Sequence, residues 1–354
     1  MKLYNTAVVG ASGMVGGELL SLLESRRFPV NKFYPFSSGR KPSAVVFKGK
    51  KYPCPKPSFA ALKKADIVFF VSTDEVSGKF APRLAAAGVW CVDDSSRFRL
   101  NPAVPLVIPK VNPGELKASK KLVAGPNCTV TGAAVALFGL HKKFKIKELR
   151  LATYQAVSGA GKGAMLQLEA ELKAYLKTGR MTGIKGGKFP HPIAFNLIPQ
   201  VGGFDKNGHS VEENKVEAEL KKIWGASAIK ISSTAVRVPV LRGHSLSVWA
   251  KTERPWTFAA LKSVLAKTRG LKFLADLYKY PVPLKQGNKT FEVYAGRLRK
   301  AKTSANEFQL WIVSDNLYKG AALNSVQIAE RIIRIPQSEF GGMREGKSED
   351  RGQK

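Results

Sequence analysis

Residues 10–16 read GASGMVG, and this stretch decides the fold that the sequence predicts. It follows a short apolar segment and precedes GELLSLLESRR, whose leucines recur at helical spacing. A strand, a glycine turn and a helix in this order are typical of a dinucleotide-binding βαβ unit. There Gly10 permits the tight turn, Gly13 lets a pyrophosphate reach backbone N–H groups, and Gly16 allows close helix–sheet packing. A glycine turn with a purely structural role is the alternative.

Three further segments, 31–36, 66–72 and 89–94, predict strands of the same parallel sheet. The last two are almost continuously apolar, as expected of strands buried on both faces. The adenine ribose of a bound dinucleotide would lie at the end of 31–36, where a carboxylate would favour NAD. The chain has SSGRK at 37–41 instead. Hydroxyls and an arginine suit a 2′-phosphate, so this stretch favours NADP(H); a polar surface loop is the alternative.

The composition is that of a folded chain large enough for two domains. Its 354 residues exceed what one ordinary core supports, and 44% hydrophobic residues exclude a disordered chain. The N-terminus carries no secretory or transit signal, and apolar runs such as 133–138 are too short to span a bilayer. Three scattered cysteines (54, 91 and 128) form no CxxC pair, and the four histidines show no metal-ligand spacing. We therefore expect a cytoplasmic protein with no membrane segment and no metal.

The chain is strongly basic. Lysine and arginine total 58 against 26 acidic residues, a formal net charge of +32. Such a field concentrates small anions and attracts nucleic acid without sequence preference. The basic residues are spread along the chain in short groups, without an RNA-binding signature, a repeat or a zinc finger. We interpret the charge mainly as a solvated surface and expect no specific nucleic-acid partner.

Cys128 lies in GPNCTV, directly before an apolar run that predicts a helix over 129–144. At a helix start the macrodipole and the unpaired N–H groups favour a thiolate, which is the nucleophilic form of cysteine. A small buried hydrophobic side chain is the alternative for any free cysteine.

The second half of the chain is rich in predicted strands. After a strand that runs into a glycine loop, four long segments have antiparallel character; these five segments are 148–161, 228–241, 244–252, 291–299 and 307–315. They predict an α+β domain whose sheet carries the site and a subunit interface. A helix at 322–334 is expected to return to the nucleotide domain.

Together these patterns predict an α/β protein: a Rossmann-type parallel-sheet domain joined to an α+β catalytic and oligomerisation domain. The first would comprise 1–128 with the returning segment 322–340, and the second would comprise 129–321. The polar residues 341–354 are expected to form a disordered tail.

A cysteine nucleophile beside a nicotinamide cofactor implies hydride transfer to or from an acyl group held as a thioester. Over residues 1–340 the sequence resembles the aspartate-β-semialdehyde dehydrogenase family. Eight motifs carry the resemblance in the family's order: GASGMVG (10–16), DDSSRFR (93–99), GPNCTV (125–130), TYQAVSGAGKGA (153–164), FNLIPQVGGF (195–204), VEENK (211–215), RVPVLRGHS (237–245) and GAALNSVQIAE (320–330).

The resemblance implies the catalytic residues. Cys128 resembles the nucleophile, His244 the general acid/base that serves it, and Gln155 the glutamine that helps to orient the bound intermediate. An ordinary polar role is the alternative for a lone histidine.

The resemblance also implies a substrate site. Arg237 would hold an α-carboxylate through its two-pronged guanidinium, and Glu212 would accept from an α-ammonium. Arg99, Lys215 and Asn127 would bind a phosphate group. Surface charge is the alternative for Arg99, Glu212 and Lys215.

For NADP(H), the resemblance implies contacts from the glycine turn, the loop after the second strand, a later glycine loop and the last helix. The residues are Gly10, Ser12, Gly13, Met14, Val15, Ser38, Arg40, Gly159, Gly161 and Asn324.

Two positions depart from the family pattern, which often has Asn where Asp94 stands and Ser where Thr129 stands. A carboxylate near Arg99 could weaken an anion site or could instead orient the arginine. Thr129 keeps the hydroxyl, so we expect little effect there.

The implied reaction is the NADPH-dependent reductive dephosphorylation of L-aspartyl-4-phosphate to L-aspartate-4-semialdehyde through a cysteine thioacyl intermediate, in lysine, threonine and methionine biosynthesis. The implied partners are a small acyl phosphate or aldehyde and inorganic phosphate, with assembly into a homodimer or homotetramer.

Related acyl-phosphate or acyl-CoA reductases are the nearer alternative. Glu212 and Arg237 argue against N-acetylglutamyl phosphate, because an acetylated amine has no charge for a carboxylate to pair with. Malonyl-CoA stays open, since Arg237 could hold its carboxylate equally well. Nucleic-acid binding as a side activity of the basic surface is the more distant alternative.

Overall fold

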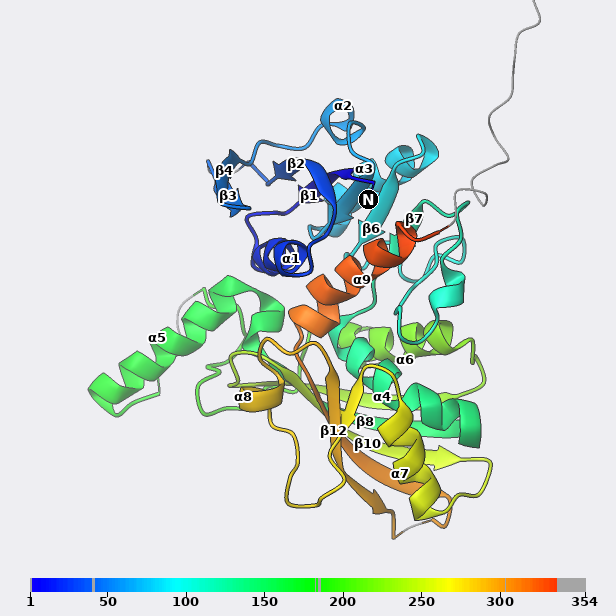
Figure 1. Cartoon of the computed structure of the whole chain (residues 1–354). Coiled ribbons are helices and arrows are strands. Elements are labelled where there is room, and N and C mark those ends of the chain that lie inside the picture. Colours follow the sequence, from blue (N-terminus) through cyan, green and yellow to red (C-terminus); the bar gives the residue numbers. More distant parts are fainter. Residues whose placement is uncertain (1, 40–41, 182, 184–185, 303, 336–354) are drawn as a thin grey trace, which may run out of the picture.

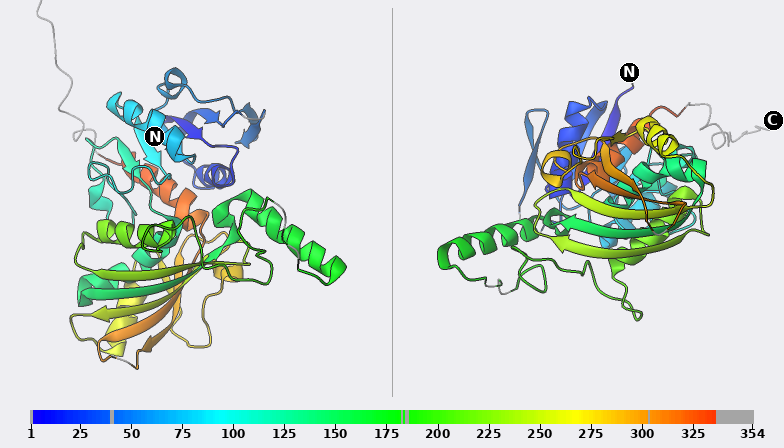
Figure 2. Two further views of the ribbon diagram at one scale, coloured as in Figure 1. Left: turned by 180° about the vertical axis from the view of Figure 1, so that it is seen from behind. Right: turned by 90° about the horizontal axis from the view of Figure 1, so that it is seen from below.

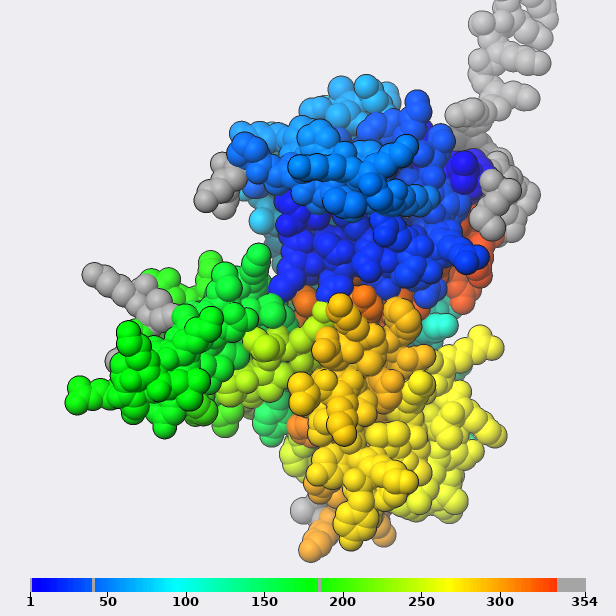
Figure 3. All heavy atoms as spheres, turned by 60° about the vertical axis from the view of Figure 1, so that its left-hand side comes forward, coloured from blue at the N-terminus to red at the C-terminus, as the bar shows by residue number. Residues whose placement is uncertain are grey.

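The computed structural model describes residues 2–39, 42–181, 183, 186–302 and 304–335. Two sheets with their helices lie one above the other in Figure 1, and the last helix, α9 (Leu323–Ile332), runs between them. Helix α5 (Lys162–Thr178) projects from one side of the molecule, as Figure 3 shows. The predicted fold class, a parallel-sheet domain joined to an α+β domain, is confirmed.

The first sheet is parallel, with five strands in the order β2–β1–β5–β6–β7. Its side chains alternate between a face covered by α1 and α9 and a face covered by α3. Both faces are therefore apolar, which explains the almost continuous hydrophobic runs in the sequence. The bounds are β1 (Tyr4–Val9), β2 (Val30–Phe36), β5 (Ile67–Phe70), β6 (Trp90–Asp93), β7 (Leu122–Ala124), α1 (Met14–Ser25) and α3 (Asp74–Ala86).

A hairpin follows β2 and is not among the elements that the sequence patterns predict. Its strands are β3 (Ala44–Phe47) and β4 (Lys50–Pro53). Phe47 anchors it, because its ring lies 4.4 Å from that of Phe33 in β2. The Ser37 hydroxyl donates to the Cys54 carbonyl at 2.9 Å, so the loop that leaves β2 is tied to the base of the hairpin. The remaining short elements of this half are α2 (Phe59–Leu62) and the 3₁₀ turn η1 (Pro113–Glu115).

The second sheet has six strands in the order β11–β12–β13–β10–β8–β9. Figure 2 shows it from behind and from below. The central pairs are antiparallel, whereas both edge strands pair in parallel with their neighbours. The bounds are β8 (Ile146–Ala156), β9 (Lys230–Val238), β10 (His244–Thr252), β11 (Leu271–Phe273), β12 (Val293–Lys300) and β13 (Glu307–Ser314).

The antiparallel character expected of 228–241 is wrong. Strand β9 pairs with β8 in parallel, from Glu148 opposite Lys230 to Ala156 opposite Val238. The connection between these strands contains α6 (Val211–Trp224), which packs against β9 and returns the chain to the end of the sheet where β8 began. A helical crossover of this kind joins parallel strands, whereas a short turn would have joined antiparallel ones. The strand predicted within 148–161 ends at Ala156, and a 3₁₀ turn, η2 (Val157–Ala160), follows.

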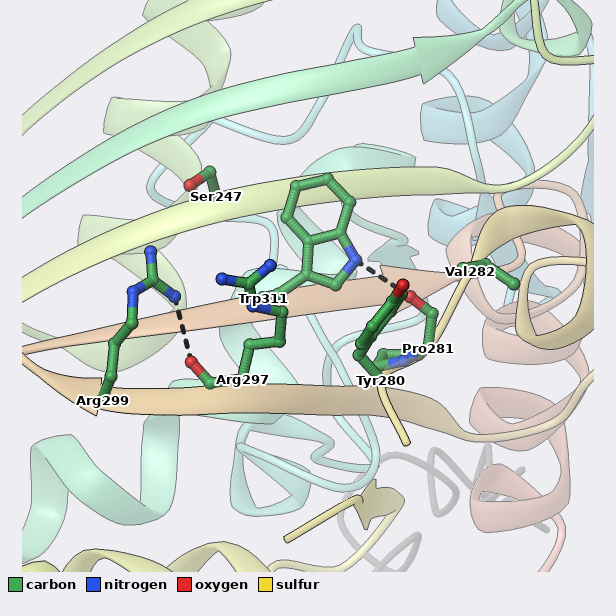
Figure 4. A pocket seen from close by; sticks show the side chains of 7 residues that line it. All are labelled: Ser247, Tyr280, Pro281, Val282, Arg297, Arg299 and Trp311. Atoms are coloured by element: carbon green, nitrogen blue, oxygen red, sulfur yellow. Dashed lines mark hydrogen bonds between the residues drawn. The ribbon is translucent and has the colours of Figure 1, made fainter. Parts of the chain in front are cut away.

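One face of the second sheet is covered and the other is open. Helices α4 (Cys128–Phe144), α6 and α7 (Phe258–Lys267) share one apolar core with the strands. On the open face a hollow of about 360 Å³ lies beside the ring of Trp311, whose Nε1 donates to the Pro281 carbonyl at 3.0 Å (Figure 4). The loop that carries Pro281 leads into α8 (Pro283–Gln286). No predicted catalytic or binding residue lines this hollow.

The last helix belongs to the packing of the first sheet. After β13 the chain forms a π-helix, η3 (Tyr318–Ala322), and continues as α9. Helix α9 shares an apolar cluster with α1 and β1, and Arg26 forms a two-pronged ion pair with Glu330 at 2.7 and 2.8 Å. This agrees with a returning helix. The predicted tail, 341–354, and the end of the returning segment lie outside the described residues.

Within the described part of the chain, no helix has both the length and the apolar character needed to cross a membrane. The same residues contain no group of three or more His, Cys, Asp or Glu side chains arranged to hold a metal ion.

Candidate active site

Cys128 is the first residue of α4, and Asn127 caps that helix. The Asn127 side-chain oxygen accepts from the backbone N–H groups of Thr129 at 2.8 Å and Val130 at 3.3 Å. This cap is favourable because the first N–H groups of a helix have no partner within it. The Cys128 side chain is only partly exposed, and Gly320 of η3 packs directly against it. A Cβ atom on Gly320 would lie 2.7 Å from Cβ of Cys128, so only glycine leaves room for the nucleophile candidate.

His244 is buried at the start of β10, and its Nε2 lies 3.3 Å from Sγ of Cys128. The backbone N–H of Ala156 donates to Nδ1 of His244 at 3.1 Å. With Nδ1 acting as an acceptor, the proton of a neutral imidazole sits on Nε2. The ring therefore presents an N–H donor to the sulfur.

Burial governs the protonation of this pair. It lowers the pKa of His244 to about 3, and the nearby Arg237 charge acts in the same direction. Removal from water raises the pKa of the Cys128 thiol to about 11; Glu212 adds to this rise, while Arg99 and Arg237 oppose it. Near neutral pH the pair is therefore a thiol beside a neutral imidazole.

Glu212 gathers three neutral donors at the base of the site. Its Oε1 accepts from Asn127 Nδ2 at 2.9 Å, from Gln155 Nε2 at 2.9 Å and from the Thr129 hydroxyl at 3.3 Å. Glu212 belongs to the first turn of α6, whose N-terminus favours a carboxylate. Thr129, the departure from the family pattern, thus uses its hydroxyl to hold Glu212.

Arg237 comes from β9, and its guanidinium lies beside Gly159 together with the His244 ring. Its Nη1 donates to the Ala156 carbonyl at 2.7 Å, and its buried Nε has no hydrogen-bond partner. A Cβ atom on Gly159 would lie 2.9 Å from Arg237 Nη1 and 3.3 Å from His244 Nε2, so this glycine allows the two side chains to meet. An arginine with an unpartnered buried donor is suited to bind an anion.

Arg99 is held by two acceptors. Its Nη1 lies 3.1 Å from Glu219 Oε1, and its Nη2 donates to the Asp94 carbonyl at 2.7 Å. The Asp94 carboxyl accepts from the Ser325 hydroxyl at 2.5 Å instead. The contact with Arg99 thus uses a backbone carbonyl that any residue at position 94 would supply, whereas the Asp94 carboxyl bonds to Ser325. Burial raises the pKa of the Asp94 carboxyl to about 7.

Lys215 lies one turn beyond Glu212 on α6, on the side of Asp74. Burial acts to raise the pKa of the Asp74 carboxyl, but hydrogen bonds from Ser96 and the charges of Lys215 and Arg99 outweigh it and lower that pKa. The geometry thus brings Lys215 into the electrostatic surroundings of Arg99.

The glycine turn has the shape that a dinucleotide requires. Gly10 has φ +94°, and a Cβ atom there would lie 2.3 Å from the Val71 carbonyl oxygen. A Cβ atom on Gly16 would lie 2.2 Å from the Gly10 carbonyl oxygen, so the helix packs closely on the turn. Ser12 and Gly13 are exposed where α1 begins, with Met14 and Val15 half-buried behind them. Backbone N–H groups at such a turn can hold a pyrophosphate.

The other predicted cofactor residues are spread over three segments. Ser38 is exposed at the end of β2, while Arg40 lies outside the described residues. Gly161, at the end of η2, has φ +89°. The Asn324 amide donates to the Val107 carbonyl at 3.0 Å, and its buried side-chain oxygen has no partner. That oxygen is an available acceptor for a cofactor amide.

Sequence reasoning missed Glu219 and Gly320. Glu219 follows Glu212 by seven residues, which is two helical turns, so helical periodicity could have placed both on one face of α6. Gly320 opens the motif GAALNSVQIAE, yet no local pattern shows that it faces Cys128.

Two family models match the chain. Residues 5–119 match "Semialdehyde dehydrogenase, NAD binding domain", and residues 137–319 match "Semialdehyde dehydrogenase, dimerisation domain". The fold and the matched domains together define a semialdehyde dehydrogenase with an NAD(P)-binding domain. The predicted boundaries at 128 and 321 stay predictions, since residues 120–136 and 320–354 lie outside both matches.

Individual relatives narrow the class. An aspartate-semialdehyde dehydrogenase from Shewanella violacea is 39% identical over 334 residues, covering 94% of this chain and 98% of the relative. The crystal structure of aspartate semialdehyde dehydrogenase II from Vibrio cholerae superposes with a TM-score of 0.90 at 33% identity, covering 94% of this chain and 99% of that one. The structure of the same enzyme complexed with ASA superposes with a TM-score of 0.89 at 34% identity, with the same coverage of both chains. The chain belongs to the aspartate-semialdehyde dehydrogenase family, which confirms the resemblance of the motifs.

Proposed function

We propose that the protein catalyses the NADPH-dependent reductive dephosphorylation of L-aspartyl-4-phosphate to L-aspartate-4-semialdehyde. The observation that carries this proposal is the contact between Cys128 and His244, at 3.3 Å, with Arg237 and Glu212 around it. A thiol nucleophile flanked by an anion-binding guanidinium and by a carboxylate is matched to a substrate with an α-carboxylate, an α-ammonium and an acyl group.

The substrate would be held at three points. Arg237 has a buried donor without a partner, which suits the α-carboxylate. Glu212 would accept hydrogen bonds from the α-ammonium in place of those from its neutral donors. Gln155, no longer bonded to Glu212, would then orient the acyl group. The phosphate would lie near Arg99 and Lys215, with the amide of Asn127 as a further donor.

The first chemical step forms the thioester. The sulfur of Cys128 bonds to the acyl carbon, the C–O bond to the phosphate breaks with its electron pair, and the thiol proton passes to the departing phosphate. Because burial raises the pKa of the thiol to about 11, the strongly basic departing phosphate is a suitable acceptor for this proton.

NADPH, when bound, supplies the hydride that reduces the acyl carbon of the thioester. The glycine turn with Gly10, Ser12, Gly13, Met14 and Val15 would hold its pyrophosphate, and Gly159, Gly161 and Asn324 would lie near the nicotinamide. Ser38 and Arg40 would meet the 2′-phosphate, which is the basis for proposing NADP(H) over NAD.

The final step releases the aldehyde. The C=O bond re-forms, the C–S bond breaks, and the sulfur leaves as a thiolate to which Nε2–H of His244 donates. This hydrogen bond stabilises the leaving group, and the solvent proton consumed in the overall reaction restores the thiol. His244 thus acts at the sulfur as a hydrogen-bond donor that stabilises the departing thiolate.

We also propose a homodimer formed through the open face of the six-stranded sheet, acting in the cytoplasm in lysine, threonine and methionine biosynthesis. Half-exposed aromatic side chains on that face, including Tyr154, Trp249 and Trp311, support the interface. The three free cysteines support a reducing compartment. The homotetramer expected as the other assembly would need a second interface.

The test is the reverse reaction. Purified protein receives L-aspartate-4-semialdehyde, phosphate and either NADP or NAD, and the absorbance of the reduced cofactor is followed beside the Cys128→Ala variant. We expect phosphate-dependent reduction of NADP that is lost in the variant, while the variant still binds NADPH. A folded protein without this activity would contradict the proposal, and malonyl-CoA with NADPH would be the next substrate.

A further inference from the structure

Glu219 is a buried carboxylate that the reaction above leaves without a role. Only 1% of its surface is exposed, and both of its oxygens are used. Oε1 lies 3.1 Å from Nη1 of Arg99, and Oε2 accepts from the backbone N–H of Asn127 at 2.6 Å. One side chain thus contacts both the guanidinium proposed for the phosphate and the residue directly before Cys128.

These two contacts link residues beyond the point where β6 and β7 stop pairing, at Asp93 opposite Ala124. Arg99 comes from the loop after β6, whereas Asn127 caps α4. Glu219 itself belongs to the middle of α6, 120 residues from Arg99 and 92 from Asn127. The carboxylate therefore links the guanidinium proposed for the phosphate directly to the start of the nucleophile's helix.

Lys222, one turn further along α6, fixes the backbone of the same loop. Its Nζ donates to the carbonyls of Arg99, Asn101 and Val104 at 2.8, 2.7 and 2.8 Å. Helix α6 thus holds Arg99 by the main chain through Lys222 and by the side chain through Glu219. Because both the main chain and the side chain of Arg99 are bound to the same helix, its guanidinium has little freedom to move.

The charge of Glu219 also helps to hold the Arg99 guanidinium in its charged form. Burial by itself lowers the pKa of Arg99, but the charge and hydrogen bond of Glu219 outweigh this effect and raise it. The Arg99 Nε is buried without a hydrogen-bond partner, so part of the guanidinium remains available to an anion.

We propose that Glu219 is a positioning residue of this site, which aligns Arg99 and Asn127 so that the phosphate group arrives beside the sulfur of Cys128. This inference rests on the proposed function, in which Arg99 binds the phosphate. Glu219 touches neither the substrate nor the reacting atoms and acts through its two partners.

The experiment compares Glu219→Gln with Glu217→Gln. Glu217→Gln is the same chemical change two residues away. Glu217 pairs with Lys221 on the outer side of α6, and its side chain is 45% exposed. Arg99 and Asn127 use different oxygens of Glu219, and a glutamine replaces one of these oxygens with an NH₂ donor, so one of the two present contacts is lost. Initial rates of the reverse reaction are measured while phosphate, aldehyde and NADP are varied in turn.

For Glu219→Gln we expect the KM for phosphate to rise by about tenfold or more, with the KM for the aldehyde within about twofold. A second readout needs no substrate: alkylation of Cys128 by iodoacetamide at pH 9. The Arg99 charge lowers the thiol pKa, so a displaced Arg99 should slow this reaction several-fold. We expect Glu217→Gln to leave both quantities unchanged.

The inference is overturned if Glu219→Gln matches Glu217→Gln in both the phosphate KM and the alkylation rate. A lowered melting temperature with both quantities unchanged would show a merely structural role. If Glu219→Gln does not fold, Glu219→Asp takes its place, because it keeps the charge and withdraws it by one methylene; we expect the same changes in smaller size. Absence of phosphate-dependent turnover in the unaltered protein would contradict the proposed function, and the alkylation comparison would still decide the role of Glu219.

Discussion

The sulfur of Cys128 and Nε2 of His244 lie 3.3 Å apart, although 116 residues separate them in the chain. The backbone of Ala156 occupies the other ring nitrogen of His244 and so directs an N–H group at the sulfur. Both partners are neutral near pH 7, because burial raises the pKa of the Cys128 thiol and lowers that of His244. The pair is therefore built to stabilise a thiolate that forms during the reaction.

The reactivity of Cys128 should follow this state. Because burial raises its pKa to about 11, the thiolate fraction at pH 8 is about one thousandth. We expect the rate of alkylation without substrates to rise about tenfold per pH unit up to at least pH 9. Mass spectrometry of the peptides assigns the label to Cys128, as distinct from the buried Cys54 and Cys91. A plateau at or below pH 8 would contradict this prediction.

Replacing His244 by Asn should lower kcat by about 10²-fold or more, because the donor no longer reaches the sulfur. The KM for the aldehyde should change little, since we propose that Arg237 and Glu212 hold the substrate. The exposed His191 offers the control, and His191→Asn should keep full activity. Steady-state kinetics of both variants check this; a His244→Asn protein as active as the control would rule out the proposed role.

Gly320→Ala should remove activity without unfolding the protein. The added Cβ atom would lie 2.7 Å from Cβ of Cys128, so the nucleophile or η3 must shift by several tenths of an ångström. We expect a loss of about 10²-fold in kcat with the far-ultraviolet circular dichroism spectrum unchanged. Gly114→Ala is the matched control, because a Cβ atom there meets no atom within 4 Å. Equal activity of the two variants would show that the site tolerates the methyl group.

Asp94→Asn should change how stability depends on pH. Burial raises the pKa of the folded carboxyl to about 7, above its value in the unfolded chain, so the folded state binds this proton more tightly. Ionisation therefore costs the folded protein stability as pH rises from about 4 through 7. At pH 8 the variant should be more stable relative to the unaltered protein than at pH 4.5, by roughly 2–4 kcal/mol.

Urea unfolding of both proteins at the two pH values measures this difference. Asp276→Asn, at a side chain that is 48% exposed, serves as the control and should show no such dependence. A difference between Asp94→Asn and the unaltered protein that stays constant across the two pH values would contradict the prediction.

Local patterns were sufficient to predict most of the strands and the glycine turn that we propose to hold the cofactor. The strand predicted at 244–252 is β10 with the same bounds. Its burial alternates along most of the strand, so the sequence HSLSVWAKT shows the two-residue period of a strand. The partner and direction of β9 were not predictable, since they depend on a crossover helix far from it in the sequence. The hairpin of β3 and β4 is short and partly exposed, and the side chain that anchors it, Phe47, pairs with a ring on another strand.

Some residues of the candidate site could likewise be predicted from local sequence patterns, and others could not. Cys128 and the glycine turn have local signals, a helix start in one case and a strand–turn–helix order in the other. The roles of His244, Arg237 and Glu212 came only through the motifs of a family, because nothing near them in the sequence shows that they meet. Glu219 has no motif of its own, and its importance depends on two hydrogen bonds across 92 and 120 residues.

The position of α9 also constrains how the chain acquires its structure on the ribosome. Leu19 and Leu23 of α1 belong to an apolar cluster completed by Val326 and Ala329, near the end of the described chain. The nascent first sheet therefore keeps one flank uncovered until the residues of α9 have been synthesised. A chain that stops before Leu323 would expose this flank permanently, so synthesis through α9 is needed to complete the apolar core of the first sheet.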